Sequence, residues 1–151
     1  MRGVMAGYPV VDFNVECFDG SYHSVDSNEA SFKMAGILAF KTIAPKARPA
    51  LLEPLMNVEV TTPDAYLGDV MGDLSGRRGQ IAGTEPSSDG HGTLVKATVP
   101  MAELHLYATK LQSLTHGHGA VRTRFKGFEL MAHEAAAKVP VRGRGKEKEE
   151  E

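Results

Sequence analysis

Two strand–helix–strand patterns follow one another in residues 48–130, and this order restricts the fold more than any other feature of the sequence. Four stretches carry the alternating apolar residues of half-buried strands: 51–61, 80–85, 93–99 and 120–129. Apolar residues at helical spacing follow Pro63 and Pro100, which suit the first position of a helix. The order β-α-β-β-α-β predicts an α+β fold of the ferredoxin-like split βαβ type, with four antiparallel strands and both helices on one face.

Each of the two predicted helices has one apolar stripe that can cover the sheet. The inward residues are expected to be Leu67, Val70, Met71 and Leu74 in the first helix, and Leu104, Ala108 and Leu111 in the second. The first helix is expected to begin after a cap at Thr62 and to end between Gly76 and Gly79.

Residues 1–47 predict one strand and one helix, which do not make a complete domain. Residues 9–18 alternate as a strand whose inward face would also bury Cys17, and a helix ends near Pro45. Asp26 and Glu29 have the spacing of a capping box before this helix. We expect the segment to be part of a layer whose other strands lie elsewhere, and to be mobile or paired with another copy through its strand edges.

The tail region spans residues 133–151. Residues 138–151 have no apolar periodicity and end in mixed charges, so we expect disorder there, with residues 134–137 as a frayed helical lead-in. The formal charge of −2 excludes a generally polycationic chain, and the single cysteine excludes a disulfide framework and a Cys-rich zinc module. No stretch approaches the length of an apolar spanning helix, so we expect a soluble intracellular protein without a membrane partner.

The loop between the first strand and the first helix concentrates groups that could contact a ligand. Its candidate residues are Gly20, Ser21, Tyr22, His23, Ser24 and Asp26. Tyrosine and histidine can stack on bases or donate to phosphate. In the simpler explanation Tyr22 and Val25 only clamp the turn and His23 is solvated, and the residues alone favour that explanation.

Two groups of cations are candidates for phosphate contact. Arg77 and Arg78 follow a predicted helix end, where they could bind phosphate or simply offset the negative end of the helix. Arg122, Arg124 and Lys126 are expected to share one outward face of the last strand. A stripe that faces RNA phosphates and an ordinary solvated face are both consistent with this spacing.

The sequence gives little support for catalysis or metal binding. His116 and His118, with His91 and His105, suggest a metal site, but no third ligand with suitable spacing is indicated. Neither a nucleophile elbow nor a G-x-x-x-x-G-K-[ST] phosphate loop occurs. We therefore expect no catalytic residue, no metal and no cofactor in this chain.

Three longer runs carry a resemblance to a known family. They are AGYPVVDFNVECFDGSYHSVDSNEASFKMAG, LLEPLMNVEVTTPDAYLGDVMGDLSGRRGQIAGTEP and VPMAELHLYATKLQSLTHGHGAVRTRF. The first resembles the second half of domain IV of translation elongation factor G, and the other two resemble its domain V. The resemblance covers about residues 3–129 and implies three parts: residues 1–47, a partial β-α segment of the ribosomal-protein-S5-domain-2-like type; residues 48–132, a ferredoxin-like domain; and residues 133–151, the tail.

The resemblance implies a cytoplasmic GTPase that moves tRNA and mRNA through the ribosome. Residues 20–26 would be a tip loop that meets the tRNA–mRNA complex in the decoding region, and the candidate cations would face ribosomal RNA. GTP and magnesium would be bound by N-terminal domains that this chain lacks, so the chain is expected to be a fragment without enzymatic activity of its own.

Some residues depart from the family pattern. Ser24 stands where many members have an acidic residue, and His105, His116 and His118 replace other residue types. These differences suggest a divergent paralogue with another ribosome role. The alternatives are a standalone ferredoxin-like interaction domain and, more remotely, a small histidine–metal enzyme.

Overall fold

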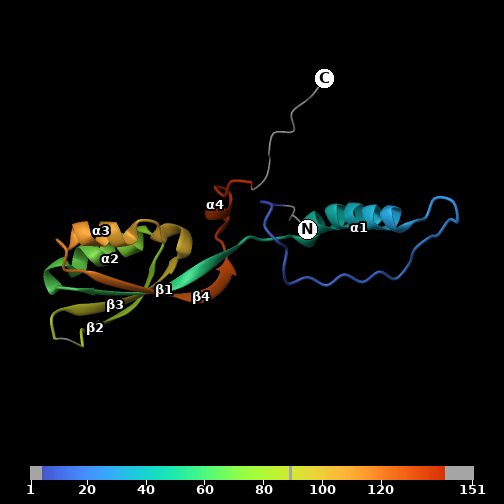
Figure 1. Ribbon diagram of the computed structural model, residues 1–151. Coiled ribbons are helices and arrows are strands. Elements are labelled where there is room, and N and C mark those ends of the chain that lie inside the picture. Colours follow the sequence, from blue (N-terminus) through green and yellow to red (C-terminus); the bar gives the residue numbers. More distant parts are fainter. Residues whose placement is uncertain (1–4, 89, 142–151) are drawn as a thin grey trace, which may run out of the picture. The chain divides into compact units, whose positions relative to one another are not determined.

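The computed structural model describes residues 5–88 and 90–141, which divide into two units (Figure 1). Leu52–Leu130 form the first of these, here called the sheet domain. The second contains residues 5–51, here called the N-terminal arm, together with residues 131–141.

The sheet domain has the predicted α+β ferredoxin-like topology. Its strands are β1 (Leu52–Thr62), β2 (Gln80–Pro86), β3 (Thr93–Pro100) and β4 (Ala120–Leu130). They form one antiparallel sheet in the order β2-β3-β1-β4. Helices α2 (Leu67–Gly76) and α3 (Tyr107–Leu114) lie together over one face of this sheet, and the other face carries no helix of the domain (Figure 1).

The core of the sheet domain lies between that helical layer and the two central strands. Fully buried side chains come from β1, β3 and both helices: Val58, Val60, Val95, Val99, Val70, Leu74 and Leu111. Cross-strand pairing places Val60 opposite Val95 and Val58 opposite Ala97, so the two strands present one continuous apolar surface. Burying each such side chain contributes about 1.5–3 kcal/mol. The predicted stripe of α2 is confirmed, with Leu67 and Met71 at its edge.

The two helices begin later than predicted. Thr62 remains in β1, and a 3₁₀ turn, η2 (Asp64–Tyr66), precedes α2. The helix predicted to follow Pro100 is interrupted before α3. A 3₁₀ turn, η3 (Met101–Leu104), comes first, and Leu106 then has a left-handed backbone with φ 56°. An α-helix cannot pass through that conformation. The turn brings Tyr107 to the inner face instead, and Ala108 is exposed.

Helix α2 ends in a Schellman motif. The Gly79 amide donates to the Leu74 carbonyl at 2.9 Å and the Arg78 amide donates to the Ser75 carbonyl at 3.2 Å. Glycine usually occupies the left-handed position of this motif, but here Arg78 adopts it with φ 57°. Gly79 is required for space, because a Cβ there would collide with the Leu74 carbonyl oxygen.

The predicted strand over residues 9–18 is wrong. The segment is extended but forms no strand, because none of its amides finds a partner strand within the described chain. The alternation still has a physical meaning, since Phe13 packs on Phe40 with ring centroids 5.8 Å apart. Cys17, predicted to be buried, is exposed because nothing covers that end of the segment.

Helix α1 (Glu29–Ile43) follows, and its cap differs from the predicted Asp26–Glu29 pair. The Asn28 side chain accepts from the Ser31 amide, and the Ser31 hydroxyl accepts from the Asn28 amide, both at 2.8 Å. Serine and asparagine therefore form the capping box two residues later. A 3₁₀ turn, η1 (Ala44–Ala47), contains Pro45, which confirms the predicted end of the helix.

The chain enters and leaves the sheet domain at neighbouring points. The Met131 amide donates to the Leu51 carbonyl at 2.8 Å, directly beyond the paired Leu52 and Leu130. Beyond it, α4 (His133–Ala136) is a short helix, within one residue of the helical lead-in expected over residues 134–137. The rest of the predicted tail from residue 142 onward lies outside the described residues.

We expect Gly79→Ala to destabilise the sheet domain by about 1–3 kcal/mol, because the added methyl group must displace the Leu74 carbonyl. Gly83→Ala is the matched control in β2, since a Cβ there meets nothing within 4 Å. Urea unfolding curves of the two variants measure the difference. Equal midpoints would contradict the steric explanation for Gly79.

Candidate functional site

The loop between the extended segment and α1 is held by short-range hydrogen bonds. The His23 amide donates to the Ser27 hydroxyl at 2.8 Å, and the Ser27 amide returns a bond to the His23 carbonyl at 2.9 Å. Asp19 accepts from the Gly20 amide at 2.7 Å. These bonds order the backbone while leaving the side chains of the loop available.

The candidate residues of the loop are on the surface. Tyr22 is 69% exposed and Val25 is 89% exposed, so they do not clamp the turn as the simpler explanation required. Gly20, Ser21, His23, Ser24 and Asp26 are also exposed. The structure thus presents all the predicted loop residues to a partner, although contact with a partner stays a prediction.

The extended segment and α1 support this loop through an apolar contact. Six apolar or small residues line a hollow between them: Phe13, Val15, Phe32, Gly36, Ile37 and Phe40. Most of these side chains remain half exposed. The arm therefore has a recognisable apolar seam but not a closed core.

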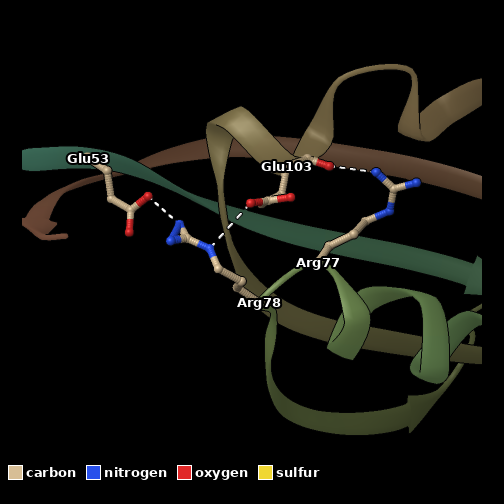
Figure 2. A network of polar contacts seen from close by, with 4 residues as sticks. All are labelled: Glu53, Arg77, Arg78 and Glu103. Carbon is tan, nitrogen blue, oxygen red and sulfur yellow. Dashed lines mark hydrogen bonds and ion pairs between the residues drawn. The ribbon is translucent and has the colours of Figure 1, made fainter. Parts of the chain in front are cut away.

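Arg77 and Arg78 are both engaged within the sheet domain (Figure 2). The Arg77 guanidinium donates to Asp73 Oδ2 at 2.7 Å and to the Glu103 carbonyl at 2.6 Å. It also lies over the Tyr107 ring, 5.0 Å from the centroid. A guanidinium with these partners fastens the end of α2 to η3.

Arg78 joins two carboxylates from different elements. Its Nη2 donates to Glu53 of β1, which is buried, and its Nε lies 3.3 Å from Glu103 Oε1. Figure 2 shows the Arg78 side chain between the two acids, and the backbone of Arg78 is left-handed with φ 57°. Sequence analysis missed these acids; only the four-residue spacing of Asp73 and Arg77 signals any part of the network.

The Tyr107 hydroxyl is buried and has no hydrogen-bond partner among the described residues. Burial, with a smaller effect of the nearby Asp73 carboxylate, raises the pKa of Tyr107 to about 12, and Arg77 opposes this shift. The phenol therefore stays neutral at pH values at which a free tyrosine is already ionised.

Two of the predicted strand cations share the open face of the sheet. Arg122 lies opposite Glu59 of β1, and Arg124 lies opposite Asn57. Within the described residues neither arginine forms an ion pair, so both guanidinium groups are available. The same face carries Lys96, which donates to Glu85 at 2.8 Å, and this hydrogen bond raises the pKa of Lys96.

Lys126 does not continue this stripe as predicted. The pairing of β1 with β4 shifts between Leu55 and Met56, which face Gly127 and Phe125. Lys126 is thus the extra residue of a β-bulge, where side-chain alternation is interrupted. Its ammonium lies 3.5 Å from Glu129.

The four histidines considered above for a metal site do not form a ligand cluster among the described residues. His116 packs beside Tyr66 with ring centroids 5.7 Å apart. Within residues 5–88 and 90–141, no group of three or more His, Cys, Asp or Glu side chains could hold a metal ion. In the same ranges, no helix is long and apolar enough to cross a membrane.

The fold and its preceding arm agree with comparisons to known proteins. A family model described as "Elongation factor G, domain IV" matches residues 1–48, and one described as "Elongation factor G C-terminus" matches residues 50–139. The chain is therefore part of a protein of the translation elongation factor class. More narrowly, the chain belongs to the elongation factor G family, which confirms the resemblance drawn from the sequence.

One relative is elongation factor G of Aquifex pyrophilus, 54% identical over 138 residues. The match covers 91% of this chain and 20% of that protein. A crystal structure of a Thermus thermophilus protein superimposes with a TM-score of 0.74 at 40% identity, covering 91% of this chain and 21% of that one. The chain thus spans about a fifth of the length of the relatives it matches.

We expect Arg78→Ala to destabilise the sheet domain by about 1–3 kcal/mol, because the buried Glu53 carboxylate loses its partner. Arg78→Gly is the matched variant: it loses the same ion pairs but suits the left-handed backbone. It should therefore be more stable than the alanine variant by about 1 kcal/mol. Chemical denaturation of both measures this, and wild-type stability in Arg78→Ala would contradict the structural role.

We expect the stability of the sheet domain to fall as the pH rises from about 10 toward 12. Because the folded state raises the pKa of Tyr107, the unfolded chain loses the phenolic proton first, and high pH favours unfolding. Below pH 10 the group contributes no pH dependence.

Tyr107→Phe should remove this part of the pH dependence while preserving the ring beneath Arg77. It should also be about 1 kcal/mol more stable at pH 7, since an unpaired buried hydroxyl is lost. Unfolding measured from pH 8 to about 11.5 compares the two proteins. If the free energies of unfolding of the two proteins changed in parallel with pH, the raised pKa of Tyr107 would be refuted.

Proposed function

We propose that this chain is the ribosome-contacting part of an elongation factor G-type GTPase that promotes movement of tRNA and mRNA. The observation that carries the proposal is the exposed loop that directly precedes α1, in a chain that belongs to this family. GTP and magnesium act in another part of the whole factor, and this chain has no GTPase site and no cofactor of its own. The parent factor works in the cytoplasm.

The loop acts as a wedge in the decoding region. Its backbone is fixed by the reciprocal bonds between His23 and Ser27, so its shape does not collapse when it meets RNA. Tyr22 and His23 supply a ring face and hydrogen-bonding groups suited to bases and 2′-hydroxyls. A stiff loop in that position opposes backward movement of the tRNA–mRNA complex.

The sheet domain acts as an anchor on ribosomal RNA. Arg122 and Arg124 are the candidates best supported by the structure, because their guanidinium groups carry no ion pair in the described chain. Lys126 can add to them from the bulge. Arg77 and Arg78 contribute mainly by fixing the domain, since their nitrogens already have partners.

We expect Tyr22→Ala and His23→Ala, placed in the full-length factor, to slow translocation by about tenfold each, the effect of losing ~1.4 kcal/mol of contact in the transition state. Lys41→Ala is the control, because this exposed residue lies on α1 fourteen positions beyond the loop's last bonded residue, Ser27. Pre-steady-state translocation on programmed ribosomes measures the rate.

Unchanged rates in both loop variants would reject the loop's assignment. Failure of the wild-type chain to co-sediment with ribosomes at low salt would reject the whole proposal. In that case the alternative of a standalone ferredoxin-like interaction domain would be favoured.

A further inference from the structure

An exposed aromatic pair lies on β4, near the end of the sheet domain where the chain enters and leaves. Phe125 is 58% exposed and Phe128 is 63% exposed. Their rings meet edge to face, with centroids 5.5 Å apart. Neither ring is part of the buried core between the sheet and its helices. Both side chains therefore leave most of their surface in water.

The β-bulge at Lys126 places the two rings on one face of the sheet. Residues three apart on a regular strand point to opposite faces. Here the extra residue shifts the pairing, so that Phe125 is paired with Met56 and the second ring, Phe128, is paired with the residue two before it on β1, Pro54. Positions two apart on β1 share a face, and Met56 packs against the core. Both rings thus lie on the face that carries the helices.

The exposed apolar surface continues to the end of the two strands. Leu130 and Leu52 form the next cross-strand pair on the same face, and both are exposed. At this end β1 and β4 extend past α2 and α3, so neither helix covers these side chains (Figure 1). The four residues Leu52, Phe125, Phe128 and Leu130 are here called the neck patch. A contiguous exposed apolar patch marks a surface at which another molecule binds.

The charges beside the neck patch are balanced rather than of one sign. Because β4 is the outer strand of the sheet, its side chains Lys126 and Glu129 lie along the border of the patch. Their charged groups are 3.5 Å apart. The two arginines of β4 that form no ion pair in the described chain, Arg122 and Arg124, stand on the opposite face. The patch therefore lacks the unpaired cations that phosphate groups require, which disfavours a nucleic acid as its occupant.

A border with one cation and one anion is complementary to itself. When a two-fold axis relates two copies, the same surface of each meets the other, and every contact occurs twice. Lys126 of one copy can then meet Glu129 of the second, and the reciprocal pair forms on the other side of the axis. The rings of both copies are buried between the two ion pairs. A partner with charges of one sign could match only half of this border.

We propose that the neck patch is the contact between two copies of this chain, which associate as a two-fold symmetric dimer. The inference goes beyond the proposed function and does not depend on binding to the ribosome. The backbone edge of β4 is unsuited to the contact, because a bulge and a lysine on an outer strand oppose pairing with a further strand. Side chains therefore form the interface. Four apolar side chains from each copy make an interface below the standard size, so the dimer is weak.

Sedimentation velocity of the full chain, from about 1 μM to about 1 mM, measures the association. The average mass of the wild type should rise with concentration toward twice that of the monomer. Phe125→Ser and Phe128→Ser should each weaken association roughly 10- to 100-fold. Phe18→Ser is the matched control, since Phe18 is 92% exposed but lies on the arm, and it should associate as the wild type does. Urea unfolding checks that the sheet domain of each variant is folded.

A pair of charge reversals tests the same contact without removing a ring. Lys126→Glu leaves two acids on the border, and Glu129→Lys leaves two cations. Each variant alone should stay monomeric, because its border repels a second copy of itself. An equimolar mixture of the two should dimerise, because every acid of one variant then meets a cation of the other. The ion pair within a copy cannot explain this recovery, since both variants have lost it.

A wild type that stays monomeric at about 1 mM would overturn the inference, and another part of the whole factor would be the favoured occupant of the neck patch. Association that survives in both serine variants would also overturn it, because the contact then lies elsewhere, as in the apolar hollow of the arm. If the mixed charge variants remain monomeric, the two-fold arrangement is rejected. None of these results decides the translocation assay, so the proposed function is tested separately.

Discussion

The packing of α2 and α3 on the central strands of the sheet is the constraint on which the domain depends. β1 and β3 present matched valines to the helices, and Val70, Leu74 and Leu111 close the layer without exposed surface. The rest of the sheet domain is positioned by this layer. The open face keeps Arg122 and Arg124 in register because β4 is paired to β1 along the same strand that carries the core.

Ion pairs and hydrogen bonds then position the segments that apolar packing does not, namely the end of α2 and the turn η3. A helix end and a 3₁₀ turn are poorly defined by valines alone, and Arg77 and Arg78 tie both to β1 through Asp73, Glu53 and Glu103. Arg78 accepts a backbone conformation that costs an ordinary residue about 1 kcal/mol. The ion pairs with a buried carboxylate offset that cost, which explains why arginine can stand where glycine is usual.

The sequence predicted the layers of the sheet domain because their periodicity is long and regular. It failed where a single backbone conformation decides the outcome. The left-handed Leu106 breaks the second helix, and the β-bulge at Lys126 removes this residue from the arginine stripe; neither feature has a periodic signal. In the arm, alternation indicated that residues 9–18 have an inward face, and Phe13 does pack on Phe40, but alternation could not show that these residues lack a hydrogen-bonded neighbour. The exposed loop was located from its residue types, whereas the acids around Arg78 come from distant elements that only folding brings together.

The hydrogen bond between Leu51 and Met131 closes the neck of the sheet domain, so its two ends emerge side by side. A unit with adjacent ends can be cut out and rejoined, inserted into a foreign loop or circularly permuted without unthreading its core. The sheet domain can therefore be transferred between proteins as one unit, and the chain into which it is inserted stays continuous.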